Sequence, residues 1–369
     1  MDNSQSPSVL VAAGGTGGHL FPAAALASAL TERGIAVHLA TDRRAIRFGD
    51  TFVPEVIHVV ASATIRSRNP LAMTQTAAAL GRGLFQAWRL IGRLHPAAVV
   101  GFGGYPSLPP VLAAVWRGVP TVIHDANAVV GRANRLLAPR VTAIATTFPE
   151  TFRDTPDLAA KATLTGNPVR AAVIAAAAIS YSAPADVLRL LIFGGSQGAR
   201  VMADVVPAAI TLLEPTLRAR LHIVQQAREE DLARVREAYA SVSVSADVAP
   251  FFSDLPARIA ASHLIVGRSG ASTVAELAAI GRPSILVPLP HAIDQDQFAN
   301  AGVLDRAGGA LRLVQEAFTP ERLAAEIAVL AGAPQRLLAM AAAARSLARL
   351  DAAARLADLV SKVAAIARR

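Results

Sequence analysis

A glycine-rich stretch, "GGTGGH" at 14–19, carries the strongest chemical signal in the sequence. It follows the apolar run "SVLVAA" and precedes the alanine-rich "LFPAAALASAL", which predicts a strand, a turn and a helix. Glycines let a backbone approach an anion closely, and the following helix offers unpaired N–H groups. Leu20 stands where a dinucleotide fingerprint requires glycine, and His19 where a Walker A loop requires lysine. The stretch therefore predicts a phosphate-binding turn of another kind, and the alternative is a tight turn without a ligand.

His19 ends this stretch and has a side chain that could act on a substrate. A histidine at the mouth of a binding site can accept a proton as a general base or contact a substrate hydroxyl. The alternative is a histidine that only caps or packs against the helix. Both readings stay open on the residues alone.

A second stretch, "GGSQGA" at 194–199, has the same layout. Ser196 and Gln197 add polar donors suited to phosphate oxygens, but the stretch has no lysine. Transfer of a phosphoryl group requires more fixed positive charge than this. The stretch therefore suits an enzyme that holds a diphosphate as a leaving group.

A third stretch, "GRSGASTVAEL" at 267–277, follows the apolar "HLIVG". Gly270, Ala271 and Ser272 would open a helix whose N-terminus can bind phosphate. Glu276 lies about one turn into this helix, where its carboxylate could accept hydrogen bonds from a ribose diol. The alternative is a simple capping arrangement of serine and glutamate.

Polar residues also follow two apolar runs in the first half, in "GFGGYPSLPP" at 101–110 and "VIHDANAVVGRANR" at 122–135. His124, Asp125 and Asn127 cluster at the end of the second run. Asp125 could act as a base or orient a histidine. The alternative is a structural aspartate paired with an arginine.

The segment "DQDQFANA" at 294–301 contains Asp294 and Asp296, which formally match a carboxylate pair for Mg²⁺ or Mn²⁺. Matches this short arise often by chance. Hydrogen bonding of Asp296 and Gln297 to sugar hydroxyls is the better interpretation. We expect no obligatory metal site.

Apolar runs of strand type alternate with helical patterns along the whole chain. A first series is predicted at 8–12, 36–40, 56–60, 97–101, 119–123 and 141–145, and a second at 188–193, 221–225, 263–267 and 284–288. Such alternation predicts parallel sheets built from βαβ units. The second series restarts with a strand, a Gly-Gly turn and a helix, so we expect two Rossmann-like domains.

The domain boundary is expected near 165–187, where "TGNPVR" and "SYSAPAD" break regular structure. We predict a first domain over 1–168 and a second over 169–344. A terminal helix at about 345–369 would return to the first domain. Ligands of open parallel sheets bind at the carboxyl ends of the strands, so two facing sheets would form one cleft.

Composition limits the class of protein. The 369 residues are 53% apolar, enough for two packed domains. There is no cysteine, which excludes disulfides and thiolate metal sites and fits a reducing compartment. The polar start "MDNSQSPS" does not resemble a signal peptide, and no apolar run approaches the ~18 residues of a membrane span.

Positive charge is concentrated in the first half. Residues 1–170 carry 16 Lys/Arg and 9 Asp/Glu, whereas residues 171–369 carry 20 and 18. Between 61 and 140 there are nine arginines and one acid. Such a field attracts nucleic acid, an anionic membrane or a diphosphate substrate.

The stretch "LGRGLFQAWRLIGRL" at 80–94 predicts an amphipathic helix within this basic tract. One stripe holds Leu80, Leu84, Trp88 and Ile91, with Phe85 beside it; the opposite side holds Arg82, Arg89 and Arg93. A core face and a wet face is the ordinary interpretation. If the tryptophan and phenylalanine were exposed, the helix would suit an anionic lipid surface.

Two other classes of protein fit poorly. A nicotinamide-linked oxidoreductase needs a GxGxxG loop with an acid about twenty residues later, and neither Gly-Gly loop has that spacing. A nucleic-acid binder would leave three glycine loops unexplained, and aromatic residues for base stacking are only 5% of the chain.

Taken together, the motifs resemble one family, the bacterial transferases that add N-acetylglucosamine to undecaprenyl-diphospho-N-acetylmuramoyl-pentapeptide. "GGTGGHLFPA", "GFGGYPSLP", "GNPVR", "GGSQGA" and "RSGASTVAEL" occur in the family's order, over about residues 8–350. The resemblance implies the α/β GT-B fold, with two Rossmann-like domains facing each other across a cleft. Another GT-B enzyme, such as a UDP-sugar 2-epimerase or a different lipid glycosyltransferase, is the alternative.

The resemblance also implies roles for individual residues. Ser196 and Arg170 would contact the donor's diphosphate, Glu276 its ribose, Phe252 its uracil through the backbone, and Gln297 its sugar. The nucleotide would be lined by Ala271, Ser272, Thr273, Val274, Ala275 and Glu276. The first domain would add Thr16, Gly17, Gly18 and Asn127 to the donor site, and His19, Tyr105 and His124 would face the acceptor.

One departure from the family concerns a candidate base. The family usually reads His-Glu-Gln-Asn where this chain has "HDAN" at 124–127. Asp125 is one methylene shorter than glutamate and Ala126 offers no amide. His19 and Asp125 are both candidates for the base of an inverting transfer.

The resemblance finally implies partners and a location. They are UDP-N-acetylglucosamine, a polyprenyl-diphosphate muramyl lipid and an anionic inner-membrane surface, with no nucleic acid. The protein is expected to be peripheral, on the cytoplasmic face of the bacterial inner membrane.

Overall fold

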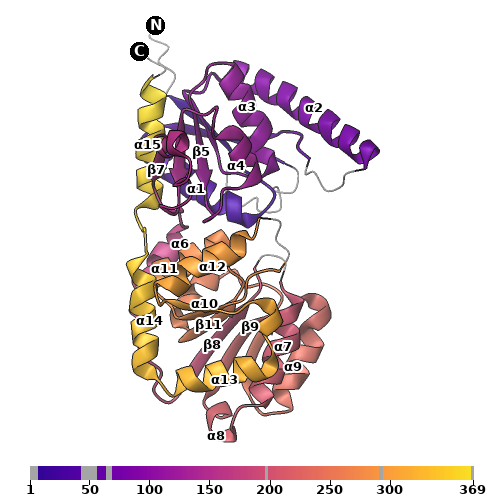
Figure 1. The fold of residues 1–369 in the computed structure, drawn as a ribbon, viewed down its shortest axis with the longest axis vertical. Helices are drawn as coiled ribbons and strands as arrows, with labels where there is room; N and C mark the ends of the chain where they lie inside the picture. The colour runs from indigo at the N-terminus through magenta and orange to yellow at the C-terminus, as the bar shows by residue number, and fades with distance from the viewer. Residues whose placement is uncertain (1–6, 43–55, 64–68, 196–197, 291–293, 367–369) are drawn as a thin grey trace. The chain divides into compact units, whose positions relative to one another are not determined.

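The computed structural model describes residues 7–42, 56–63, 69–195, 198–290 and 294–366. The chain divides into two compact units. Unit 1 comprises Met1–Arg170 together with Arg349–Arg369, and unit 2 comprises Ala171–Ala348. Each unit is an α/β layer structure around its own parallel sheet (Figure 1).

The sheet of unit 1 has seven strands in the order β3-β2-β1-β4-β5-β6-β7, all parallel. They are β1 (Ser8–Ala12), β2 (Ala36–Thr41), β3 (Ile57–Val59), β4 (Ala98–Gly101), β5 (Thr121–Asp125), β6 (Ala143–Thr146) and β7 (Ala162–Leu164). The helices of this unit are α1 (Gly17–Thr31), α2 (Pro70–Leu94), η3 (Tyr105–Ser107), α3 (Leu108–Trp116), α4 (Arg132–Leu137), α5 (Pro156–Ala159) and α15 (Ala352–Ile366).

The sheet of unit 2 has six parallel strands in the order β10-β9-β8-β11-β12-β13. They are β8 (Leu188–Phe193), β9 (Leu221–Gln226), β10 (Ser245–Ala249), β11 (Leu264–Gly267), β12 (Ser284–Leu286) and β13 (Ala310–Arg312). The helices are α6 (Ala171–Ala177), α7 (Arg200–Thr211), α8 (Pro215–Arg218), η4 (Glu229–Asp231), α9 (Leu232–Ala240), α10 (Leu255–Ala261), α11 (Ala271–Ile280), α12 (Asp296–Arg306), η5 (Gln315–Ala317), α13 (Pro320–Ala331) and α14 (Pro334–Ser346).

The predicted class, two Rossmann-like parallel-sheet units, is confirmed. Each of the ten predicted strands is present, with ends shifted by up to two residues. Three strands were not predicted: β7, β10 and β13. All three lie at sheet edges, where a strand is less buried than in the middle of the sheet. Their sequences therefore lack the continuous apolar run by which a buried strand is recognised.

The glycine-rich turns lie where the order of each sheet reverses. In unit 1, β1 pairs with β2 on one side and β4 on the other, and in unit 2 β8 lies between β9 and β11. The turns after β1 and β4, and those after β8 and β11, therefore flank a topological switch point. Crevices at such points are where open α/β sheets bind ligands.

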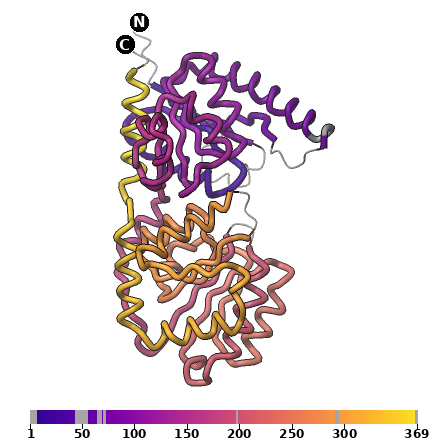
Figure 2. The backbone as a smooth tube through the Cα atoms, viewed as in Figure 1, coloured from indigo at the N-terminus to yellow at the C-terminus, as the bar shows by residue number. Residues whose placement is uncertain are grey.

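The C-terminal helix α15 completes the core of unit 1. Its buried Leu356, Ala357, Val360 and Val363 join the cluster formed by α1 and the sheet. Arg33, just after α1, donates to the Ala354 carbonyl oxygen at 3.0 Å and pairs with Asp358 at 2.8 Å. Figure 2 shows the yellow C-terminal segment returning beside the indigo start of the chain.

Helix α2 matches the alternative in which its tryptophan and phenylalanine are exposed. Leu90 and Ile91 are buried as a core face requires, but Trp88 is 37% exposed and Phe85 62% exposed. Trp88 shares its predicted stripe with the buried Ile91 but is itself exposed. The exposed face of α2 thus combines large aromatic rings with Arg82, Arg89 and Arg93.

Within the described part of the chain, no single helix is both long and apolar enough to cross a membrane. Helices α13 and α14 together meet the length and composition test, but the chain bends by 97° between them.

Candidate functional site

The turn after β1 is held by a buried carboxylate from the neighbouring strand. The Gly15 backbone N–H donates to Oδ1 of Asp42 at 3.2 Å, and Asp42 is 6% exposed. A Cβ on Gly14 would lie 3.0 Å from that same oxygen and 3.0 Å from Cβ of Pro106. A side chain at position 14 would therefore require Asp42 or Pro106 to shift by a few tenths of an ångström. Thr16 is the N-cap of α1, and Gly17 and Gly18 form its first turn.

His19 lies against the glycines that follow β4. A Cβ on Gly104 would be 3.3 Å from Nε2 of His19, and a Cβ on Gly103 would be 3.6 Å from Cε1. Both glycines have a positive φ, which is +81° at Gly103 and +69° at Gly104. Glycine at 103 and 104 thus permits the turn and leaves room for the imidazole. The turn continues into η3, which begins at Tyr105.

His124 is fully buried at the end of β5. Its Nε2 lies 3.0 Å from the carbonyl oxygen of Gly166, so this nitrogen carries the proton and donates. The ring centroid lies 5.3 Å from that of Phe102. Burial, opposed by the Gly166 hydrogen bond and assisted by the nearby His19, lowers the pKa of His124 to about 4. The side chain is therefore neutral at physiological pH.

This burial predicts an acid-sensitive fold. Because the pKa of His124 falls from 6.5 to about 4 on folding, only the unfolded chain gains this proton as pH drops through that window. The free energy of unfolding should then decrease by about 3 kcal/mol between pH 6.5 and 4. Urea denaturation at several pH values measures it. In the His124→Gln variant the unfolding free energy should depend less steeply on pH between 6.5 and 4. An equal dependence in both proteins would contradict a buried, neutral His124.

Asp125, the other candidate base, has both carboxylate oxygens engaged by donors. Oδ1 accepts the Asn127 N–H at 3.2 Å, and Oδ2 accepts the Gly131 N–H at 2.9 Å and the Asn134 side-chain amide at 3.1 Å. The residue is 1% exposed, and burial raises the pKa of its carboxyl while these hydrogen bonds oppose the rise. The arrangement favours a role in fixing the 125–131 turn, which carries Asn127.

Arg170 ends the first segment of unit 1. Its guanidinium carbon lies 4.1 Å from the ring centroid of Phe21, in the second turn of α1. The cation is therefore placed beside the helix that opens with Thr16, Gly17 and Gly18. The structure thus groups these expected donor residues with His19 and His124 near the carboxyl ends of the strands of the first sheet.

In unit 2, the turn after β8 is held from β9. The Gly194 N–H donates to Oε1 of Gln226 at 3.0 Å, and Gln226 Nε2 donates to the Pro250 carbonyl at 3.1 Å. Gly198 has φ +67°, and a Cβ there would meet the Arg228 side chain at 2.7 Å. Ser196, expected at the diphosphate, lies outside the described residues.

Helix α11 opens without a side-chain cap from its N-cap residue, because that residue is Gly270. A helix N-terminus without a side-chain cap from its N-cap residue is compatible with anion binding. Val274 is 2% exposed and belongs to the core, whereas Ala271, Ser272, Thr273 and Ala275 are half-buried. Glu276 is 6% exposed, on the second turn.

Gln297 lies on the first turn of α12, next to the turn after β11. Its Oε1 accepts the Leu289 N–H at 3.0 Å, and its carbonyl oxygen accepts the Ser269 hydroxyl at 2.8 Å. The Asn300 amide donates back to the Ser269 carbonyl at 3.3 Å. The sugar-contact candidate is thus tied to the same turn that opens α11.

Two remaining expectations concern the uracil contact at Phe252 and a metal site. Phe252 is 8% exposed, and the guanidinium carbon of Arg258 lies 4.2 Å from its ring centroid. Asp296 accepts the Gln297 N–H at 2.8 Å. Among the described residues, no group of three His, Cys, Asp or Glu side chains could hold a metal ion.

Sequence reasoning missed three supporting residues: Asp42, Asn134 and Arg268. Asp42 directly follows β2, so its position at a strand end was an available signal. Asn134, 2% exposed, binds both the His124 carbonyl at 2.9 Å and the Asp125 carboxylate. No local pattern marks it, because its partners are about ten residues away.

Comparison with known proteins decides the family. The glycosyltransferase family 28 N-terminal domain matches residues 9–146, and the family 28 C-terminal domain matches residues 189–358. A curated Rhodopseudomonas palustris protein is 61% identical over 365 residues, covering 98% of this chain and 100% of its own. It is named UDP-N-acetylglucosamine–N-acetylmuramyl-(pentapeptide) pyrophosphoryl-undecaprenol N-acetylglucosamine transferase. A Bradyrhizobium protein of the same name is 60% identical over the same share of both chains.

The chain belongs to this transferase family.

Solved structures agree with the family assignment. The crystal structure of Acinetobacter baumannii MurG superposes with a TM-score of 0.78 at 31% identity, covering 96% of this chain and 99% of that one. A Neisseria meningitidis UDP-GlcNAc 2-epimerase superposes with a TM-score of 0.69 at 12% identity, covering 96% and 100%. The epimerase shares the fold alone. The predicted resemblance to the bacterial transferases that add N-acetylglucosamine to undecaprenyl-diphospho-N-acetylmuramoyl-pentapeptide is confirmed, and the epimerase alternative is not favoured.

Proposed function

We infer that this family 28 transferase moves N-acetylglucosamine from UDP-N-acetylglucosamine to the muramyl sugar of a pyrophosphoryl-undecaprenol-linked pentapeptide. The carrying observation is the 61% identity over the full length of a curated transferase of that name. The glycine turns at the switch points of both sheets support it, since they are suited to a sugar diphosphate.

Unit 2 would bind the donor. The N-termini of α7 and α11 supply N–H groups and positive dipole ends for the diphosphate, with Ser196 in the first of these turns. Glu276 would accept hydrogen bonds from the ribose, and the chain at Phe252 would contact the uracil. Gln297 would contact the sugar.

Unit 1 would bind the acceptor and supply the base. The muramyl hydroxyl attacks the anomeric carbon while UDP leaves from the opposite face, which inverts that centre. UDP leaves as a stabilised diphosphate, with Arg170 and the helix N-termini offsetting its charge. His19, beside the turn at Gly103 and Gly104, is the better placed proton acceptor, because the carboxylate of Asp125 already accepts three hydrogen bonds.

The activity is tested with labelled UDP-N-acetylglucosamine and a short-chain muramyl lipid acceptor. Label transfer that requires the muramyl lipid is the expected result. Release of free N-acetylmannosamine without transfer would identify a 2-epimerase and overturn the proposal. Full transfer in the presence of a chelator would support catalysis without an obligatory metal.

An acceptor carried on a polyprenyl chain stays in the bilayer, so we propose that unit 1 docks on the cytoplasmic face of the inner membrane. Met73, Phe85 and Trp88 on α2 and Trp116 on α3 are exposed. The Arg117 guanidinium carbon lies 4.2 Å from the Trp88 ring centroid, which joins the two helices at this surface. Aromatic rings bordered by arginines suit an anionic lipid interface.

Replacing Phe85 and Trp88 together by serine should greatly reduce flotation with anionic liposomes, because both rings are exposed and make up much of the apolar face. UDP-N-acetylglucosamine binding should stay unchanged. Leu212→Ser, on a 55% exposed residue of unit 2, is the matched control and should float like the wild type. If the double variant floats as well as the wild type, α2 is not part of the membrane-binding surface. If the wild type floats equally well with neutral and anionic liposomes, the electrostatic part of the proposal is wrong.

A further inference from the structure

Arg268 is a buried cation in the turn between β11 and α11. The residue is 8% exposed. Its Nη1 donates to the carbonyl oxygens of Val287 at 3.1 Å and Pro288 at 2.9 Å, and its Nη2 donates to Oε1 of Gln315 at 2.6 Å. These three acceptors are neutral, and burial lowers the pKa of the guanidinium. Burying a cation costs free energy of folding when its hydrogen-bond acceptors carry no opposite charge. The presence of an arginine at this position therefore suggests a role beyond packing.

The guanidinium joins segments that are separate in sequence. Val287 and Pro288 follow β12, and Gln315 begins η5 after β13. Arg268 thereby fixes the backbone just before Leu289, whose N–H holds Oε1 of Gln297. The next residue, Ser269, holds the backbone of Gln297 through its hydroxyl. Two adjacent residues of one turn therefore determine where Gln297 lies.

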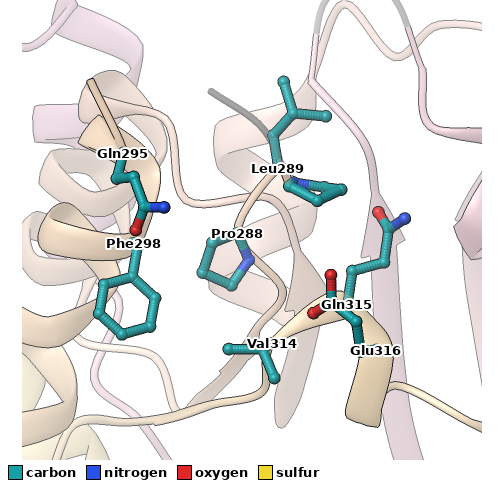
Figure 3. Close-up of a pocket in the computed structure, with 8 residues that line it drawn as sticks. Pro288, Leu289, Gln295, Phe298, Val314, Gln315 and Glu316 are labelled. Atoms are coloured by element: carbon teal, nitrogen blue, oxygen red, sulfur yellow. The ribbon is translucent and has the colours of Figure 1, made fainter. Parts of the chain in front are cut away.

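Two of the residues that accept hydrogen bonds from Arg268, Pro288 and Gln315, also line a cavity of about 250 Å³. Figure 3 shows Pro288 between Phe298 and Gln295 on one side and Gln315 and Glu316 on the other. Arg268 bonds to the Pro288 carbonyl and the Gln315 amide, so it holds the central and one lateral element of this wall together.

We propose that Arg268 is a positioning residue for the donor's sugar: it clamps the Val287–Leu289 backbone so that Gln297 is oriented toward the sugar. The proposal rests on the proposed function. Since the Leu289 N–H donates to Oε1 of Gln297, Nε2 is the atom through which this amide would bind a sugar. Gln297 can then donate to a sugar oxygen, and loss of the clamp would allow the amide to rotate.

The test compares two ligands on the full-length protein. Arg268→Met removes the hydrogen bonds and keeps much of the volume. The affinity for UDP-N-acetylglucosamine, measured by calorimetry, should fall at least about tenfold, while the affinity for UDP stays within about twofold. A purely structural arginine would weaken both ligands together, because the nucleotide and sugar subsites share one unit.

A second variant covers the case in which Arg268→Met does not fold. Gln315→Met removes only one partner of the guanidinium and should shift the affinity ratio in the same direction by a smaller factor. Arg236→Met is the matched control, since Arg236 also donates to a backbone carbonyl of unit 2, that of Val248 at 2.7 Å, but on α9. This control should leave the ratio unchanged.

The outcomes separate the two proposals. A changed ratio of UDP-N-acetylglucosamine to UDP affinity in the Arg268 or Gln315 variant supports the clamp. If the wild-type enzyme transfers N-acetylglucosamine and the folded variant keeps the wild-type ratio of UDP-N-acetylglucosamine to UDP affinity, the clamp is overturned and the proposed function stands. A wild-type protein that neither binds nor transfers this sugar overturns the proposed function.

Discussion

The His19→Ala variant is expected to lose about 10²- to 10⁴-fold in turnover while keeping its affinity for UDP-N-acetylglucosamine. His19 belongs to unit 1, whereas the proposed nucleotide and sugar contacts lie mainly in unit 2. Its imidazole lies against the left-handed turn at Gly103 and Gly104, which leaves no room for a Cβ without a contact of 3.3–3.6 Å. The ring is thus positioned by the backbone of a neighbouring strand end.

Steady-state kinetics with the muramyl lipid, after a check of folding by circular dichroism, measure this loss. Asp125→Asn is the informative companion, because it replaces the other candidate base. If Asp125 fixes the 125–131 turn, its variant should lose stability and acceptor affinity but retain the wild-type dependence of kcat on pH. Near-normal turnover in both folded variants would mean that neither residue is the base.

The Arg282→Met variant is expected to lose about 3–5 kcal/mol of unfolding free energy. Arg282 is 1% exposed. Its guanidinium donates to the carbonyl oxygens of Ala260 at 2.6 Å, Ile280 at 2.8 Å and Ile179 at 3.1 Å. The first two carbonyls lie in the last turns of α10 and α11, whose dipoles favour a cation there. Removing the cation leaves these acceptors buried without it.

Urea denaturation of the purified chain measures this effect. Arg282→Lys should lie between the wild type and Arg282→Met, because an ammonium keeps the charge but cannot donate in the same fork. Arg236→Met should change the unfolding free energy by about 1 kcal/mol or less, since it removes a hydrogen bond from an exposed residue. A loss below about 1 kcal/mol in Arg282→Met would show that the helix ends do not depend on this side chain.

The sequence predicts the architecture well because buried parallel strands are continuous apolar runs. "LRLLIF" at 188–193 coincides with β8, and the Gly-Gly turns follow β1 and β8 as expected. The edge strands β7, β10 and β13 are not predicted in this way, because "ATL", "SADVA" and "ALR" are too short or too polar to form an apolar run. The exposure of Trp88 is not predicted either, because helical spacing alone does not tell a core stripe from an exposed aromatic face.

The candidate site is predictable where local geometry demands particular residues. Glycine at 103 and 104 is such a case, because a left-handed turn strongly favours it. Residues that act through distant partners are not predictable in this way. Arg268 and Asn134 show the difference, since each is defined by hydrogen bonds to segments that only folding brings near.

Unit 1 is built from two separated stretches of chain, and this has a consequence during synthesis. All of 171–348 leaves the ribosome before α15 does, so unit 2 has its complete sequence while the apolar surface over α1 still lacks Leu356 and Val360. Unit 2 can therefore complete its folding before unit 1 does, whereas domains usually fold in order from the N-terminus. A premature stop after residue 348 would release a chain in which unit 2 is complete but unit 1 lacks α15, so the apolar surface over α1 would be exposed to chaperones and proteases.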